Sequence, residues 1–279
     1  METPLVTVII PSYNRASTLP RAIDSVLMQQ DIAFELIIVD DASTDNSADI
    51  LKPYLSSVRY IQHNKNQGAA ASRNTGITAA TTEYIAFLDS DDSWLAGKLK
   101  TQYNAMQTQP DIPLSVTAVS IHKTGCTPYN HTPQKTHKTW LDSMFHGQNF
   151  CPGSTLMAKR NLFESVGLQN PALKRLEDID WLIRYFTHYD TITIVPDIYA
   201  NVYASGNAAQ NQILAALAQM ETQHANQTYA SSFALWKTIE TLAAYWRSRN
   251  LGMAWFTILR FTLAYPSQTN ALLRRILKR

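Results

Sequence analysis

Hydrophobic residues in the first ninety positions occur in short runs that alternate with amphipathic segments. The run at residues 5–11 is unbroken, which is typical of a strand buried on both faces of a sheet. Similar runs cover residues 34–39, 58–62 and 84–88. Helical spacing appears between them: after Ser17, from about Asn46 to Pro53, and over residues 69–80. Strands that alternate with helices predict an α/β fold, with a mostly parallel, Rossmann-like sheet and right-handed crossovers.

The rest of the chain is patterned less clearly. Residues from about Leu114 to Phe150 are polar, histidine-rich and poorly periodic, which favours one or two further strands with a long flexible connection. An apolar segment at 154–158, a helix at about 177–189 and a strand at 191–195 follow. Residues 207–279 are predicted to be wholly helical, so we expect a domain over 1–206 and a helical C-terminal extension over 207–279.

The fourth strand leads directly into an acidic cluster, Asp89-Ser90-Asp91-Asp92. Two carboxylates about 4 Å apart repel by roughly 4 kcal/mol at an effective dielectric constant of 20. A divalent cation such as Mg²⁺ or Mn²⁺ removes that cost and suits an all-oxygen site that holds phosphates. The alternative is a solvated turn that caps a helix starting near Trp94, since Asp and Ser are favoured helix caps.

Polar residues follow the other strands as well. The first strand leads to Tyr13, Asn14 and Arg15, and the second ends in Asp40 and Asp41. In open α/β sheets, ligands bind outside the carboxyl ends of the strands, so one shared pocket explains these positions. Residues 1–67 contain no glycine, which excludes a Gly-rich dinucleotide fingerprint and a P-loop there. Any nucleotide phosphates would therefore be held through a metal ion.

Charge is distributed unevenly along the chain. Residues 230–279 carry eight Lys or Arg against one acid, a net charge of +7, whereas residues 1–229 carry −5. The acidic half argues against nucleic acid as a partner, and the basic end favours an anionic membrane surface. The two cysteines, Cys126 and Cys151, do not form a disulfide framework, which predicts a reducing, cytoplasmic setting. No secretory signal is expected, because the chain enters a strand almost at once.

Four segments in this order resemble the signatures of family 2 glycosyltransferases, which are inverting enzymes with the GT-A fold. They are residues 6–15 (VTVIIPSYNR), 38–45 (IVDDASTD), 66–76 (NQGAAASRNTG) and 87–92 (FLDSDD). The resemblance is close over residues 4–100 and looser over 150–205. It implies a metal-dependent transferase with Mn²⁺ or Mg²⁺ as cofactor, with a donor half at 1–110 and an acceptor half at 111–206. The donor would be a nucleotide sugar, UDP-linked by preference.

The resemblance also implies a role for each matching residue. Asp91 would bind the metal ion directly, and Asp89 would reach the ribose or the metal's water shell. Asp41 or its neighbour Asp40 would accept a hydrogen bond from uracil, and Arg73 would lie near the base and diphosphate. The remaining donor-binding residues would be Pro11, Tyr13, Asn14 and Ser90. The alternative to a donor-binding role for Arg73 is that it only forms an ion pair with Asp40 or Asp41.

A second acidic segment, residues 176–184 (LEDIDWLIR), resembles the part of the family that carries the general base. We assign the base to Asp178, and its neighbours Glu177 and Asp180 keep the choice of base open. The alternative is an acidic first helical turn favoured by the helix dipole. The chain departs from the family at 167–171, which lacks a Phe-Asp-Glu sequence, and at 199–207, which lacks an Arg or His for the diphosphate.

Smaller roles are also predicted from the pattern. Asp45 and Asp92 would cap helices, and Asn74 and Gly76 would shape helix packing. Trp181 is expected in the core rather than against a sugar. In the C-terminal region, the aromatic residues are predicted to lie in the core or on a dimer surface. They are Trp236, Tyr245, Trp246, Trp255 and Phe256.

Residues 270–279 form a basic amphipathic pattern, with an apolar stripe that includes Leu272 and Leu273. This segment could lie on anionic lipid at the inner face of the cell membrane, or its stripe could pack on the protein.

Three functions compete. The first is an inverting glycosyltransferase that acts on a glycan or lipid-linked acceptor in surface polysaccharide biosynthesis, as a monomer or a homodimer. The second is a catalytically inactive nucleotide-sugar-binding partner subunit, which the missing Arg or His at 199–207 favours. The third is a sugar-phosphate nucleotidyltransferase, which needs a Gly-rich loop after the first strand and finds none.

Overall fold

The computed structural model describes residues 3–204, 210–224 and 226–276. The chain forms two compact units. The first, which we call the sheet unit, comprises Met1–Pro133, Asn149–Ala172 and Glu177–Gly206. The second, the helical unit, comprises Gln134–Gln148, Leu173–Leu176 and Asn207–Arg279.

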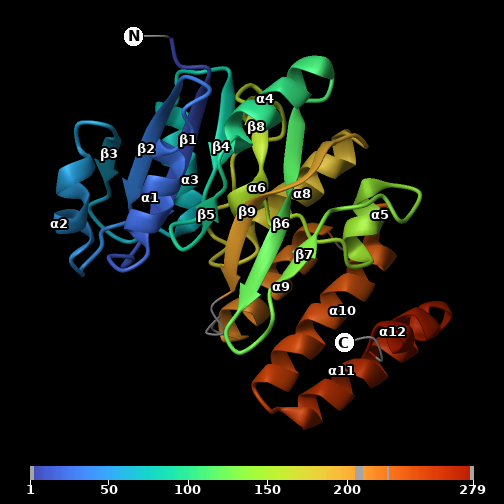
Figure 1. Ribbon diagram of the computed structural model, residues 1–279. Helices are drawn as coiled ribbons and strands as arrows, with labels where there is room; N and C mark the ends of the chain where they lie inside the picture. The colour runs from blue at the N-terminus through green and yellow to red at the C-terminus, as the bar shows by residue number, and fades with distance from the viewer. Residues whose placement is uncertain (1–2, 205–209, 225, 277–279) are drawn as a thin grey trace. The chain divides into compact units, whose positions relative to one another are not determined.

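The sheet unit is built on a nine-stranded sheet with the order β3-β2-β1-β4-β8-β6-β9-β5, and β7 pairs with β6 (Figure 1). Strands β1 to β4 are parallel to one another, and β6 is parallel to β9. Strand β8 runs antiparallel between β4 and β6, and β5 and β7 are antiparallel at their pairings. The strands are β1 (Val6–Ser12), β2 (Phe34–Asp40), β3 (Arg59–Gln62), β4 (Tyr84–Phe87), β5 (Ser93–Trp94), β6 (Leu114–Lys123), β7 (Tyr129–His131), β8 (Met157–Lys159) and β9 (Thr193–Ala204).

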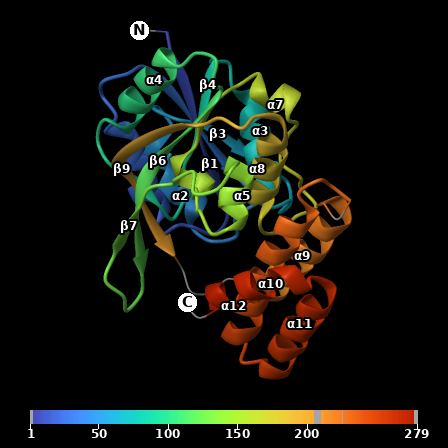
Figure 2. The same ribbon diagram turned by 90° about the vertical axis from the view of Figure 1, so that its right-hand side faces the viewer.

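Helices cover both faces of this sheet. Figure 2 shows α4 on one face and α3 and α8 on the other. The helices of the sheet unit are α1 (Leu19–Leu27), α2 (Ser47–Leu51), α3 (Ala69–Ala79), α4 (Lys98–Thr108), α6 (Pro152–Thr155), α7 (Leu162–Ser165) and α8 (Glu177–His188), with a 3₁₀ turn at Lys52–Tyr54. All seven residues of β1 are buried, which explains why all but Thr7 and Ser12 are apolar. The α/β class predicted from the alternation of elements is therefore confirmed.

Close packing between α3 and β1 depends on Gly76. A Cβ atom there would lie 2.5 Å from Ile9 Cγ2, closer than carbon atoms pack, so only glycine fits without a shift. The prediction that Gly76 shapes helix packing is confirmed. Asn74 on the same helix exchanges hydrogen bonds with the backbone of Gln169, which ties α3 to the loop before α8.

Some predicted elements were wrong in detail. Residues Ser93 and Trp94 form β5 instead of opening a helix, and α4 begins at Lys98. Ser17 does not cap the first helix, whose cap residue is Thr18. The strand predicted at 191–195 runs on to Ala204, because residues 198–204 continue the pairing with β6 after a β-bulge.

The helical unit contains α5 (Trp140–Phe145), α9 (Gln210–His224), α10 (Ala230–Arg247), α11 (Leu251–Ala264), a 3₁₀ turn (Pro266–Gln268) and α12 (Thr269–Ile276). Its apolar core is formed by side chains from α10, α11 and α12, namely Leu235, Ile239, Leu242, Ala254, Phe261 and Leu272. Within the described ranges, every helix is too short or too polar to cross a bilayer.

Candidate active site

The acidic cluster lies at the carboxyl end of β4, where the sequence places it. The Asp89 and Asp91 side chains keep 36% and 28% of their surface exposed. Asp89 pairs with Arg73 (Oδ1 to Nη2, 2.6 Å) and Asp91 pairs with Arg15 (Oδ2 to Nη2, 3.2 Å). Ser90 between them is buried. Two carboxylates at one strand end are thus partly open to solvent, and each is paired with an arginine side chain.

Arg73 joins the two acidic segments of the chain. Its buried guanidinium donates from Nη2 to Asp89 and from Nη1 to Glu177 Oε1 at 2.8 Å. Burial alone would lower the pKa of Arg73. The negative charges of Asp89, Glu177 and Asp178 outweigh this effect, so the pKa of Arg73 is raised above its ordinary value. The alternative pairing of Arg73 with Asp40 or Asp41 is wrong. The structure brings Asp89 and Glu177 together, although 88 positions of sequence separate them.

Asp178 begins α8 in a half-buried position. The pKa of Asp178 is raised to about 7, mainly by burial and then by the negative charges of Glu177 and Asp89, while Arg73 opposes the shift. Its Oδ1 accepts a hydrogen bond from the Ile179 backbone N–H at 2.8 Å. A carboxylate whose pKa lies near neutrality can accept a proton and release it again, which a general base requires.

Asp180, the other candidate on α8, lies in a different environment. It is buried, and its Oδ2 accepts a hydrogen bond from Arg184 Nε at 3.2 Å. Trp181 is also buried, and its Nε1 donates to the Gly167 carbonyl at 2.8 Å, which confirms its placement in the core. Asp180 therefore serves the packing of α8, and the assignment of the general base to Asp178 stays a prediction.

Asp92 does not cap a helix, so that prediction was wrong. It is buried, and its carboxylate accepts hydrogen bonds from Ser154 Oγ and from the Tyr203 backbone N–H (2.9 Å for the second). Burial raises the pKa of Asp92 to about 7, with Asp89 as the next cause, and burial likewise raises the pKa of Asp91. Asp92 thus connects the acidic cluster to β9. This strand includes residues 199–204, part of the segment that lacks the Arg or His expected from the family resemblance.

The carboxylates after β2 are buried and hydrogen-bonded. Asp41 accepts bonds from the backbone N–H groups of Gln67 and Gly68 and contacts His63 Nδ1 at 2.7 Å. Asp40 accepts from the Tyr60 hydroxyl at 2.7 Å and from the Ser43 N–H at 2.9 Å. These contacts fix the loop at residues 63–68 beside the end of β2. A uracil contact by either carboxylate stays a prediction.

The loop after β1 carries the remaining predicted donor residues. Pro11 is buried within β1, and Tyr13 is exposed on the loop. Asn14 Oδ1 accepts hydrogen bonds from the N–H groups of Thr44 (2.8 Å) and Asp45 (3.3 Å), so it joins the ends of β1 and β2. Asp45 Oδ1 accepts from the Ser47 N–H at 3.0 Å, which anchors the start of α2. Tyr13 has the surface that a nucleoside could meet.

Residues 151–154 complete the site, and sequence reasoning missed them. A Cβ atom on Gly153 would lie 2.3 Å from Asp89 Oδ2, so the carboxylate rests against this glycine. Ser154 Oγ accepts from the Asp89 N–H at 3.2 Å and donates to Asp92. Burial raises the pKa of Cys151 to about 12, and the charges of Asp92, Asp178 and Asp89 add to the shift.

Backbone strain also concentrates around the site. Non-glycine residues with positive φ cost free energy and persist where surrounding contacts hold them. Three of the five such residues in the described chain are or adjoin predicted site residues: Asn14 (φ 52°), Ala42 (φ 60°) and Leu176 (φ 62°). A fourth, Cys151 (φ 44°), lies two positions before Gly153, the residue that Asp89 rests against. Of these, only Asn is a residue type that favours this conformation, so the other three give no sequence signal.

The carboxylates of Asp89 and Asp91 fit a divalent cation. They are partly exposed, each pairs one oxygen with an arginine, and Asp89 raises the pKa of Asp91 by repulsion. A Mg²⁺-like ion is bound by one or two carboxylates and takes its other ligands from water and phosphate oxygens. Residues 3–204, 210–224 and 226–276 contain no group of three or more His, Cys, Asp or Glu arranged as a metal site. With Asp89 and Asp91 as its protein ligands, such an ion would have coordination positions left for water and phosphate oxygens.

The sheet and its acidic strand ends define a glycosyltransferase of the GT-A type. The chain belongs to glycosyl transferase family 2, whose model matches residues 7–167. It is 35% identical over 187 residues to TuaG of Bacillus subtilis (strain 168), named as a teichuronic acid biosynthesis glycosyltransferase. That match covers 64% of this chain and 71% of TuaG.

A second relative is WfgD of Escherichia coli, named as a UDP-Glc:alpha-D-GlcNAc-diphosphoundecaprenol beta-1,3-glucosyltransferase. It is 41% identical over 107 residues, 38% of this chain and 42% of WfgD. The match therefore spans less than half of WfgD's own length.

Solved structures confirm the fold. TarS 1–349 of S. aureus, in a complex with UDP-GlcNAc, superposes with a TM-score of 0.69 at 19% identity, and the match covers 96% of this chain and 83% of that fragment. The mannosyltransferase PcManGT from Pyrobaculum calidifontis, in complex with GDP-Man and Mn²⁺, gives a TM-score of 0.63 at 17% identity and covers 98% and 85%. The predicted GT-A fold is thus confirmed.

Proposed function

We propose that the chain is an inverting, metal-dependent glycosyltransferase in surface polysaccharide biosynthesis. The donor is a nucleotide sugar, UDP-linked by preference, and the acceptor is a glycan or a lipid-linked saccharide. The names of TuaG and WfgD support the pathway and the lipid-linked acceptor, and the UDP-GlcNAc complex of TarS supports the donor class.

The contact of Arg73 with both Asp89 and Glu177 carries this proposal. It places the acidic cluster predicted to face the donor phosphates beside the segment predicted to hold the base. Transfer requires both groups in one site, because the bond to the leaving group breaks while the acceptor oxygen attacks. A purely structural acidic turn would not need a partner from α8.

The chemistry follows from these positions. Asp178 takes the proton from the acceptor hydroxyl while the oxygen of that hydroxyl forms a bond to the anomeric carbon of the donor sugar. The bond from that carbon to the nucleoside diphosphate breaks, and the diphosphate leaves with the bonding electrons. Attack opposite the leaving group inverts the anomeric configuration. A positioned base of this kind contributes about 10²–10⁴-fold to the rate.

Asp91 and Asp89 would hold the divalent ion. When bound, Mn²⁺ or Mg²⁺ would act as a Lewis acid that neutralises charge on the diphosphate. Tyr13, on the exposed loop after β1, would border the nucleoside, and Arg73 would orient Asp89 and Glu177 from behind the site. We also propose that this protein is cytoplasmic and contacts the inner face of the cell membrane.

The basic segment predicted to touch the membrane, 270–279, lies partly outside the described residues. In its described part, Leu272 is buried in the core of the helical unit, and Arg275 donates to the Phe145 carbonyl. Leu272 therefore packs on the protein, as in the second of the two alternatives considered for the stripe, whereas Leu273 is exposed. Lipid contact by 277–279 stays a prediction, as does a homodimer.

Donor turnover tests the proposal. The purified chain is incubated with UDP-, GDP- and dTDP-sugars with Mn²⁺ and with a chelator, and nucleotide release is measured with and without acceptor lipids. We expect release from one donor class only with the metal ion. If donors bind with the metal ion but none is turned over with any acceptor, the result favours the second function, a catalytically inactive nucleotide-sugar-binding partner subunit. If none binds, both proposals fail.

A further inference from the structure

Helix α11 in the helical unit is apolar on two sides. Ala254 and Phe261 lie in the core of that unit. The opposite side carries Leu251, Trp255, Leu259 and Leu263, which recur every four residues and form one continuous stripe. These side chains are 55%, 71%, 58% and 75% exposed. Phe256 adjoins the stripe and is more than half exposed. We call these five residues the α11 stripe.

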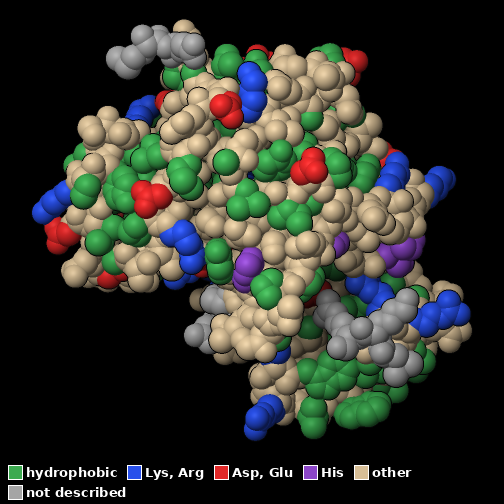
Figure 3. All heavy atoms as spheres, viewed as in Figure 1, with side chains coloured by type: hydrophobic (Ala, Val, Ile, Leu, Met, Phe, Trp, Pro, Cys, Tyr) green, Lys and Arg blue, Asp and Glu red, His purple; other side chains and the backbone are tan. Residues whose placement is uncertain are grey.

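The aromatic residues of this region were predicted to lie in the core or on a dimer surface. Trp236 is buried, but Trp255 and Phe256 are among the most exposed large hydrophobic side chains of the described chain. Figure 3 shows hydrophobic side chains gathered over this helix, with Lys and Arg side chains in the same region. Contiguous exposed apolar surface of this kind marks an interaction site.

Basic residues outnumber acidic ones around the stripe. No Asp or Glu occurs from Thr241 to Arg279, whereas α10 to α12 carry Arg247, Arg260, Arg274 and Arg275 in their described parts. Helix α10 also carries Lys237 and Glu240. On a helical projection Arg260 lies at the edge of the stripe, about 40° beyond Phe256. An apolar face with a tryptophan and a border of arginines is the composition of helices that lie in the interface of an anionic bilayer.

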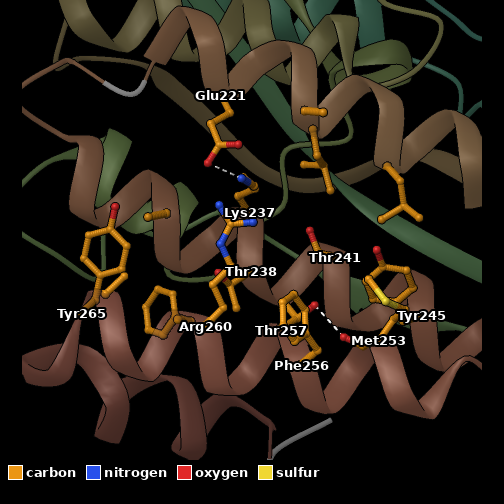
Figure 4. Close-up of a pocket in the computed structure, with 16 residues that line it drawn as sticks. Glu221, Lys237, Thr238, Thr241, Tyr245, Met253, Phe256, Thr257, Arg260 and Tyr265 are labelled. Atoms are coloured by element: carbon orange, nitrogen blue, oxygen red, sulfur yellow. Dashed lines mark hydrogen bonds and ion pairs between the residues drawn. The ribbon is translucent and has the colours of Figure 1, made fainter.

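A pocket opens beside the stripe and shares residues with it. Its volume is about 390 Å³, and its walls come from α9, α10 and α11 (Figure 4). Phe256 belongs to both the pocket and the stripe, and Arg260 extends from α11 toward Lys237 of α10 (Figure 4). Lys237 pairs with Glu221, so two cations face one carboxylate. The excess positive charge suits the anionic headgroup of a lipid whose chain meets the apolar walls.

We propose that the α11 stripe docks the protein on an anionic lipid bilayer, with Arg260 at the depth of the headgroups. The helix has 14 residues, fewer than the roughly 20 that span a bilayer, so it would lie in the plane of the interface. A second copy of the chain is the less favoured occupant. Two such faces would bring their arginines together, and α11 and α12 offer no acid to pair with them.

The test is sedimentation of the purified chain with vesicles of phosphatidylcholine, with or without phosphatidylglycerol. We expect salt-sensitive binding to the anionic vesicles only. The double variant Trp255→Ser/Leu259→Ser should weaken binding at least about tenfold, because two apolar side chains no longer enter the interface. Both residues are exposed, so the variant should keep the thermal unfolding of the parent.

A matched control removes equally exposed apolar residues of the sheet unit, Met28→Ser/Leu55→Ser, and should bind like the parent. Equal binding by the stripe variant and the parent, or no binding by the parent, would overturn the proposal. So would a parent that is dimeric by light scattering and a stripe variant that is monomeric, with no vesicle binding by either. No donor or acceptor is present, so failure here and failure of the proposed transfer are observed separately.

Discussion

Gly153→Ala tests the position of Asp89 without changing a charged group. A Cβ atom on residue 153 would lie 2.3 Å from Asp89 Oδ2 and 2.8 Å from its Cγ. Ordinary contact begins at about 3.4 Å, so the carboxylate must retreat by about 1 Å. The Asp89 Oδ1 to Arg73 Nη2 contact of 2.6 Å cannot survive that shift unchanged.

Two magnitudes follow from this displacement. Overpacking of this size costs about 1–3 kcal/mol in the free energy of unfolding. Misplacing a catalytic group by about 1 Å costs roughly 10²-fold in rate. We therefore expect kcat/KM for donor turnover to fall about 100-fold and Mn²⁺-dependent UDP binding to weaken, while thermal unfolding shifts by only a few degrees.

The control is Gly252→Ala, because a Cβ atom there meets nothing within 4 Å. It should leave UDP binding unchanged and stabilise α11 by about 0.5–1 kcal/mol. A double-mutant cycle isolates the cause: in an Asp89→Ala background, Gly153→Ala should cost little more. If Gly153→Ala alone binds UDP and turns over donor like the parent, Asp89 does not act where the structure places it.

Four further predictions concern the base and the core. Asp178→Asn should keep UDP binding and lower transfer about 10²–10⁴-fold, measured by product formation at saturating donor, whereas Asp180→Asn should lose far less. Because the pKa of Asp178 is raised to about 7, kcat should rise with pH through about 7, and a flat profile between pH 6 and 8 would contradict the assignment. The folded state binds this proton more tightly than the unfolded chain, so the free energy of unfolding should fall as pH rises from about 4 to about 7, and Asp178→Asn should reduce that slope in urea titrations. Gly76→Ala should lower unfolding free energy by about 1–3 kcal/mol through its contact with Ile9 and leave KM unchanged; an unchanged urea midpoint would refute the packing argument.

The sequence predicted the donor side of the fold well because its strands are continuous apolar runs. Each run ends where polar residues begin, so the positions of Asp40 and Asp89 at strand ends follow from the pattern alone. The contact between Asp89 and Glu177 could not be predicted from the pattern, because it depends on how α8 packs and on Arg73 pointing between them. The motifs were identified by their resemblance to a family, whereas the contact between the two acidic segments depends on the folded structure.

Other parts could not be predicted for physical reasons. Gly153 and Ser154 lie more than 60 residues beyond Asp89, and small residues carry no periodic signal. Asp92 resembles any helix cap until Ser154 and Tyr203 are seen to hold it. Helix α11 is apolar on two opposite sides, so its pattern does not show which of them faces solvent. The exposure of Trp255 follows only from the packing of α10 and α12.

The division of roles between Asp91 and Asp178 is the central claim, and calorimetric titration of UDP tests it most directly. The titration is run with Mn²⁺ and with a chelator on the parent, Asp91→Asn and Asp178→Asn. We predict metal-dependent binding by the parent and by Asp178→Asn, and its loss in Asp91→Asn. Metal-dependent binding that survives in Asp91→Asn, or is lost in Asp178→Asn, would contradict the account.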